Sequence, residues 1–222
     1  MAVSILSNSS NVGGAAATSR SYNHTCPSGT TLLLVRVALR GSTNTPGSVT
    51  ASYGGTALTS VAGTSISNSG NRAHTVMLAL PMPPVGQAQA LAVSWSQSST
   101  CILTGSNVAG SSSLPVGGAG VYGSSAAPGV FTGSSVSGAL VIDSLVANSN
   151  RVLTPGSGLT AQYAQLATST GNNDVAHRAA TRPAAASVGM TWAMDSSANW
   201  VISACVLLPS SPPNSGSFFA FF

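Results

Sequence analysis

Charged side chains are scarce in this chain of 222 residues, which has seven arginines, three aspartates, and neither lysine nor glutamate. Charged residues make up 5% of the chain, whereas about a quarter is usual in soluble domains. Solubility must therefore come from Ser, Thr, Asn and exposed backbone. Such a surface has little charge repulsion to keep neighbouring molecules apart, so it suits a protein that is packed inside a dense assembly.

Helix signals and long apolar runs are also missing. Lys and Glu, which favour helices, are absent, and Gly and Pro recur throughout. No apolar stretch approaches the ~18 residues that cross a bilayer, so we expect no membrane partner. The first residues lack the basic and apolar regions of a secretory signal, so we expect synthesis in a reducing cytoplasm.

The few basic and sulfur-containing residues form no recognisable site. The formal charge is +4, but the arginines are scattered and are not interleaved with stacking aromatics, so we expect no nucleic-acid partner. Cys26, Cys101 and Cys205 lie far apart without metal-ligand spacing. We interpret them as small buried hydrophobic residues, and we expect neither a metal nor a cofactor.

The sequence does contain the alternating patterns that are typical of β-strands. In Thr31–Arg40, leucine and valine alternate with a second set that contains Arg36 and Arg40, which predicts a strand whose arginine face is wet. Gly54-Gly55 lies between two β-prone runs and predicts a tight hairpin. Further strands are predicted at Arg72–Leu80, Gln89–Gln97, Cys101–Ala109, Gly138–Ala147, Leu159–Thr168 and Val175–Thr181.

The last two predicted strands have the most regular alternation. Val188, Met190, Trp192 and Met194 alternate with other residues, and the run from Trp200 to Leu208 does the same. If they form one hairpin, Met194 faces Trp200 and Trp192 faces Ile202 on one side of a sheet. Gly138–Ala147 is apolar on both faces, which is typical of a central strand.

These patterns predict an all-β protein: an antiparallel, jelly-roll-like β-sandwich of about ten strands. Residues 1–20 are predicted to be a flexible amino-terminal arm, and residues 21–209 the sandwich domain. Residues 210–222 are predicted to be a carboxyl-terminal tail rich in Pro, Ser and Phe.

Five motifs in order carry a resemblance to a known group. The sequence contains Tyr53-Gly-Gly-Thr-Ala-Leu58, then Leu80-Pro-Met-Pro-Pro84, Gly138–Asp143, and Leu153–Gly158, and closes with Trp192, Ser197-Ala-Asn-Trp200 and Leu207-Leu-Pro209. In these it resembles a widespread group of β-sandwich virion and tail-associated proteins of tailed bacteriophages and prophages. The resemblance implies a place in a virus particle and no catalytic residues. The chain departs from the group's pattern at His74–Leu80 and in its Phe-rich tail.

Catalytic residues are few. The groups suited to acid-base chemistry are Asp143, Asp174, Asp195, His24, His74 and His177. Asp174 and His177 are three apart, which places them on opposite faces of a strand. Gly118–Gly123 matches a dinucleotide-binding fingerprint, but no helix can follow it, so we interpret it as a glycine-rich loop. We therefore expect no enzyme activity.

The residues that we expect to contact partner molecules lie in the carboxyl-terminal tail and at one tryptophan. Pro209, Pro212 and Pro213 end the last strand, and the residues beyond carry the predicted partner-docking side chains Phe218, Phe219, Phe221 and Phe222. Trp95 and Trp192 lie within alternating apolar runs and are predicted to be core, whereas Trp200, beside a loop, is the possible exposed aromatic.

The sequence thus predicts a structural virion protein, a capsid decoration or cement protein located in the virion. Its expected partners are the major capsid protein, other virion proteins and copies of itself, with a trimer as the expected oligomer. The alternative is a receptor- or glycan-binding module of a tail fibre or baseplate.

Overall fold

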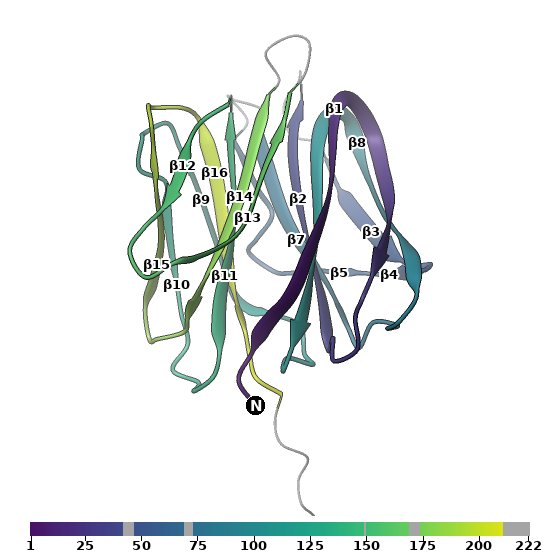
Figure 1. Cartoon of the computed structure of the whole chain (residues 1–222). Coiled ribbons are helices and arrows are strands. Elements are labelled where there is room, and N and C mark those ends of the chain that lie inside the picture. Colours follow the sequence, from purple (N-terminus) through teal and green to yellow (C-terminus); the bar gives the residue numbers. More distant parts are fainter. Residues whose placement is uncertain (42–46, 69–72, 149, 169–173, 211–222) are drawn as a thin grey trace, which may run out of the picture.

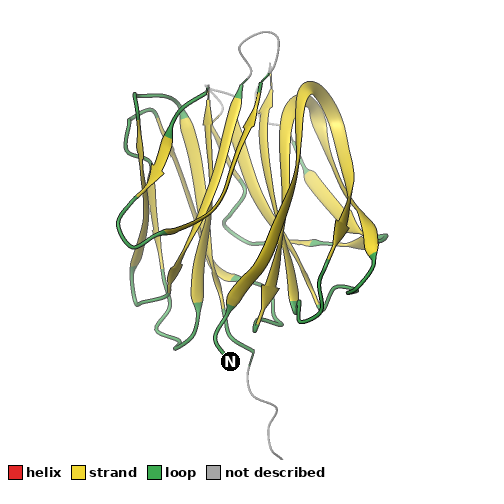
Figure 2. Ribbon diagram, viewed as in Figure 1, coloured by secondary structure: helices red, strands yellow, loops and turns green. Residues whose placement is uncertain are grey.

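The computed structural model describes residues 1–41, 47–68, 73–148, 150–168 and 174–210, whose regular secondary structure consists of antiparallel strands (Figures 1 and 2). The all-β prediction is confirmed, with sixteen strands in the described chain where about ten were predicted. The first half of the chain contains β1(Ser4–Thr25), β2(Leu32–Gly41), β3(Val49–Tyr53), β4(Thr56–Ala57), β5(Thr59–Ser60), β6(Ile66–Asn68), β7(Ala73–Pro81) and β8(Ala88–Ala109). The second half contains β9(Val116–Gly123), β10(Gly129–Thr132), β11(Leu140–Asn148), β12(Leu153–Pro155), β13(Thr160–Ala167), β14(Val175–Pro183), β15(Val188–Met194) and β16(Trp200–Leu207).

The strands form four layers that lie side by side in Figure 1. In the first half, β1 and β8 are long enough to run through two layers, so their sheet curls back into a nearly closed barrel. The second half has a five-stranded sheet, β13-β14-β11-β16-β9, and a three-stranded sheet, β10-β15-β12. The five-stranded sheet packs against β2, β7 and the second part of β8, so the two halves meet through these inner sheets.

The second half repeats the strand order of the first. β2 lies between β7 and β8 and pairs Leu32 with Pro81, while β11 lies between β14 and β16 and pairs Leu140 with Pro183. β9 and β10 pair with β16 and β15 as the two ends of β1 pair with the two ends of β8. The molecule is therefore two small β-sandwiches in tandem, which differs from the predicted single sandwich, and the jelly-roll arrangement is not confirmed.

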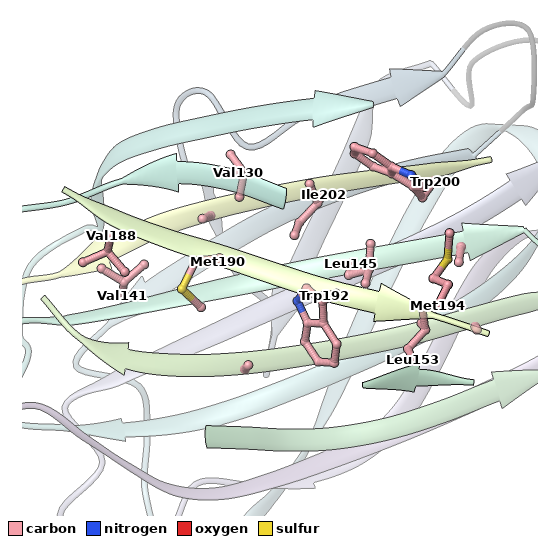
Figure 3. Packing of buried hydrophobic residues seen from close by; sticks show 14 of the residues in the cluster. Val130, Val141, Leu145, Leu153, Val188, Met190, Trp192, Met194, Trp200 and Ile202 are labelled. Atoms are coloured by element: carbon pink, nitrogen blue, oxygen red, sulfur yellow. The ribbon is translucent and has the colours of Figure 1, made fainter. Parts of the chain in front are cut away.

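Each half has its own apolar core, and further clusters lie between the halves. The core of the second half contains Trp192 and Met190 of β15 together with Val141 and Leu145 of β11 (Figure 3). The core of the first half is built in the same way from β2, β3, β7 and β8. Between the halves, the Cys205 sulfur lies 3.5 Å from that of Met77.

Several local predictions are confirmed. Gly54 and Gly55 both have positive φ, 55° and 85°, and connect β3 to β4 in a hairpin, which is the conformation that glycine permits. β11 is a central strand with both faces buried. The three cysteines are buried and free, as expected.

Two predictions about the ends of the chain are wrong. Residues 1–20 are not a flexible arm, because β1 pairs with β8 along nearly all of its length. An edge strand such as β1 is fixed by backbone hydrogen bonds to its neighbour, so it needs few apolar side chains. The polar sequence of residues 1–20 therefore gave no sign of a strand. The last two strands do not form a hairpin, because β15 pairs with β10 and β12, while β16 pairs with β11 and β9.

The prediction of a glycine-rich loop at Gly118–Gly123 is also wrong. The segment is not a loop but belongs to β9, an edge strand of the five-stranded sheet. Its glycines admit close neighbours: a β-carbon on Gly118 would lie 1.7 Å from the Ala62 carbonyl oxygen of the other half. Glycine within a strand is typical of such a close backbone approach.

Candidate interaction surfaces

The predicted docking side chains Phe218, Phe219, Phe221 and Phe222 lie outside the described residues, but the point from which the tail departs is defined. The Ser210 amide donates a hydrogen bond of 2.7 Å to the Gly110 carbonyl oxygen. Pro209 and Ser210 line a groove of about 470 Å³ together with Met1 and Val136. Val136 is 47% exposed. The tail therefore begins in the wall of a groove that already displays apolar side chains.

The prediction that Trp200 is exposed is wrong. Its side chain is 5% exposed, belongs to the core of the second half, and donates from Nε1 to the Ser125 carbonyl oxygen at 3.1 Å. Trp95 and Trp192 are both 4% exposed, so their assignment to the core is confirmed. None of the three tryptophans is available to stack on a sugar ring at the surface.

Sequence reasoning missed two exposed aromatics, Tyr122 on β9, which is 61% exposed, and Phe131 on β10. Val130, the neighbour of Phe131, is 2% exposed and packs in the core, whereas Phe131 is 68% exposed on the opposite face of the strand. The ring lies beside Gly189, where a β-carbon would come 2.9 Å from Cε1. The short run Gly129–Thr132 does alternate, but four residues are too few to separate an inward from an outward face without the partner strand.

A buried polar network joins the two halves. Arg36 of β2 is fully buried, donates from Nη2 to Asn8 Oδ1 at 3.2 Å and to the Ser106 hydroxyl, and lies over the Tyr163 ring of β13. Its Nε and Nη1 atoms have no hydrogen-bond partner among the described residues. The predicted wet face of this strand is therefore the face that packs against the second half.

His177 and Ser144 form a second part of this network. Ser144 Oγ lies 2.9 Å from His177 Nε2 and 2.7 Å from Thr75 Oγ1, and the Tyr163 hydroxyl lies 2.9 Å from the same imidazole nitrogen. Burial, followed by the charges of Arg36 and Arg178, lowers the pKa of His177 well below its ordinary value. Although a serine beside a neutral histidine resembles a nucleophile and base, both side chains are fully buried and a substrate has no access to them.

Asp143 is the buried carboxylate of the second core. It accepts hydrogen bonds from the Ala180 amide at 2.6 Å and from Trp192 Nε1 at 2.7 Å, which ties β11 to β14 and to the outer sheet. Burial raises the pKa of Asp143 to about 7, although these donors and the charge of Arg36 oppose the rise. The sequence placed Asp143 in a central strand, and this is confirmed.

The remaining candidates do not converge. Asp174 precedes β14, and its carbonyl oxygen accepts a bond of 2.8 Å from Arg40 Nη1, while Asp195 lies beyond the end of β15. Within the described ranges, no group of three or more His, Cys, Asp or Glu side chains could hold a metal ion. No helix of the described chain is long and apolar enough to cross a membrane.

No protein-family model matches this chain, and no curated protein matches it either.

Proposed function

We propose that this protein is a structural component of a tailed-phage virion, a capsid decoration or cement protein that packs on the capsid lattice. The proposal rests on the place where the carboxyl-terminal tail begins: Pro209 and Ser210 line a surface groove together with Val136. The tail that follows ends in four phenylalanines. Such a cluster in water is an aggregation hazard, so a function that buries it against a neighbour accounts for its presence.

Three further features support the proposal. Arg36 and Asp143 are fully buried, which reduces further the few charges that the chain can present to a neighbouring molecule. The motifs shared with phage β-sandwich proteins support a virion location, the major capsid protein as a partner, and a homo-oligomer such as a trimer. The buried positions of Ser144 and His177 support a non-enzymatic role.

Deletion of residues 214–222 tests the proposal. We expect the truncated protein to keep the unfolding midpoint of the full chain, because the sandwich cores lie within the described residues, and to lose self-association and binding to particles. Full-length protein and the variant are compared by sedimentation and by co-purification with virus particles. Unchanged assembly of the truncated protein contradicts arm docking.

A matched variant separates the aromatic rings from tail length. Replacing the four phenylalanines with serine keeps the length and the prolines, and we expect it to behave like the deletion. Counting copies on labelled particles then locates the protein. Hundreds of copies over the head support decoration, whereas a handful at the tail contradict it.

The second candidate function is a receptor- or glycan-binding module on a tail fibre or baseplate. Phe131 favours it, because its aromatic ring, exposed beside Gly189, is a suitable stacking surface. Replacing Phe131 with Ser should abolish binding to host cells while leaving self-association intact. If cell attachment is unchanged in that variant, Phe131 has no binding role.

A further inference from the structure

Strand β9 is the edge of the five-stranded sheet, because it pairs with β16 on one side and with no described strand on the other. None of its eight residues is buried. Over residues 119–123 its register with β16 is regular, and the one irregularity lies before this stretch. The unpaired N–H and C=O groups of such an edge are a template on which a further strand can form.

The other edge strands of the described chain are protected against pairing with a further strand. β4, β5, β6, β10 and β12 are only two to four residues long. At β13, Asn8 of β1 donates from Nδ2 to the Gln162 carbonyl oxygen at 3.4 Å, and β1 itself has three register irregularities and carries Arg20. Short strands, covering segments, bulges and charged side chains all block a sheet edge. β9 has neither a charge nor a proline, so residues 119–123 lack these protections.

Apolar side chains are exposed on both faces of β9. Val121 lies opposite Ile202, which belongs to the core of the second half, and is 44% exposed. Tyr122 lies opposite Val201, which belongs to a cluster between the halves, and is 61% exposed. Aromatic and β-branched side chains stabilise a sheet when they meet across neighbouring strands. The edge of β9 therefore suits a strand that carries apolar side chains on both of its faces.

The carboxyl terminus supplies such a segment. Residues 218–222 are four phenylalanines and one alanine, without charged side chains or proline, and aromatic residues favour strands. Because alternate residues of a strand point to opposite faces, this segment would carry phenylalanine on both. The chain continues for twelve residues beyond Ser210, which reach ~40 Å at most when extended. Pro212 and Pro213 favour an extended chain, so the segment can leave its own sheet and reach a neighbour.

We propose that residues 218–222 of one copy add as a further strand to the β9 edge of a second copy. In this mode of recognition, backbone hydrogen bonds supply affinity and alternate side chains supply specificity. Neither β9 nor the added segment has a charged side chain, so two copies meet here without repulsion between like charges. The inference rests on the proposed function, in which the tail docks on a neighbour, and names the surface of that neighbour.

Two variants and their mixture test this site by sedimentation. Val121→Lys places a charge on the β9 edge and leaves the tail intact, whereas deletion of residues 214–222 removes the tail and leaves the edge free. We expect that neither variant self-associates alone and that an equimolar mixture forms a 1:1 complex, because the tail of one fits the edge of the other. Val152→Lys is the matched control, since Val152 is 64% exposed and lies outside the strands, and it should self-associate like the natural protein.

Amide hydrogen exchange detects the added strand without a substitution in β9. Alternate amides within residues 119–123 point away from β16, and they should exchange about tenfold or more slowly in the full-length protein than after the deletion. Equal exchange in the two proteins, or slow exchange in a monomer, would overturn docking on the β9 edge of a second copy.

The sedimentation results separate this inference from the proposed function. Self-association of folded Val121→Lys protein, or a mixture that stays monomeric, would overturn the β9 site while leaving the docking of the tail on a neighbour intact. Unchanged self-association after deletion of residues 214–222 would instead contradict the proposed arm docking, and the inference with it.

Discussion

The guanidinium carbon of Arg36 lies 4.7 Å from the centroid of the Tyr163 ring, and this contact joins the two halves of the molecule. Arg36 comes from the central strand β2 of the first half, and Tyr163 from the edge strand β13 of the second. A buried cation without a carboxylate partner is costly. The ring face and the oxygens of Asn8 and Ser106 compensate part of that cost.

This arrangement predicts that the Tyr163 ring matters more than its hydroxyl. Tyr163→Phe should lower the free energy of unfolding by about 1 kcal/mol, because it removes one hydrogen bond to His177. Tyr163→Leu should cost roughly 2 kcal/mol more, because it also removes the desolvated cation–π contact. Urea unfolding midpoints measure both variants. Equal losses would show that the ring face does not stabilise Arg36.

A second prediction concerns Trp192, which combines packing with a hydrogen bond. Trp192→Ala should cost roughly 3–5 kcal/mol as a large core truncation. Trp192→Phe keeps a ring but leaves Asp143 Oδ2 without its donor, which should cost about 1–3 kcal/mol. Trp200→Phe is the matched control, because it frees only a partly buried backbone oxygen and should be milder. Urea unfolding midpoints of the three variants measure these losses. A loss of stability in Trp200→Phe as large as that in Trp192→Phe would contradict a special role for the hydrogen bond to Asp143.

The carboxyl of Asp143 predicts a pH dependence. Its pKa is raised by burial from 3.8 to about 7, so the folded protein holds a proton that the unfolded chain releases. The associated stability is fully present below pH 3.8 and is lost as pH rises through about 7. At ~1.4 kcal/mol per pH unit, the loss is roughly 4 kcal/mol at most.

Asp143→Asn isolates this contribution, because it removes the titration. Burial lowers the pKa of His74 and His177, so these groups destabilise the fold as pH falls, in the natural protein and the variant alike. The difference in unfolding free energy between the two proteins should therefore favour the natural protein most at low pH. A difference that stays constant from pH 4 to pH 7 would mean that Asp143 is ionised throughout this range.

Core membership could be predicted from the sequence more readily than strand partners. The alternation placed Met190 and Trp192 on one face of their strand and Ile202 on one face of the next, and these three residues belong to one core. Trp200, predicted to be exposed, belongs to the same core. The error was to place the strands side by side, whereas they lie in different sheets and face each other across that core. Alternation reports which face is buried, and both arrangements bury the same face.

Burial by a second sheet explains the other main error. Arg36 alternates with leucine and valine, and in a strand with one buried face this alternation predicts that Arg36 faces solvent. A strand in the middle of a four-layer stack has no wet face, and Arg36 is accommodated by partners from β1 and β13 that are distant in sequence. The tandem repeat of strand order, which explains this stack, is visible in the pairing of the strands, with Leu32 opposite Pro81 in one half and Leu140 opposite Pro183 in the other.

The last prediction concerns a close backbone approach between the halves, at Gly118. A β-carbon on Gly118 would lie 1.7 Å from the Ala62 carbonyl oxygen, and backbone cannot swing aside as a side chain does. Gly118→Ala should therefore lower the free energy of unfolding by about 1–3 kcal/mol, the usual cost of overpacking. Gly189→Ala is the matched control, because Gly189 also lies in a strand but the three atoms nearest to an added β-carbon belong to the Phe131 ring, which is exposed and can rotate. Its midpoint should hardly change, and equal losses in the two variants would show that the cost comes from replacing glycine in a strand and not from the contact between the halves.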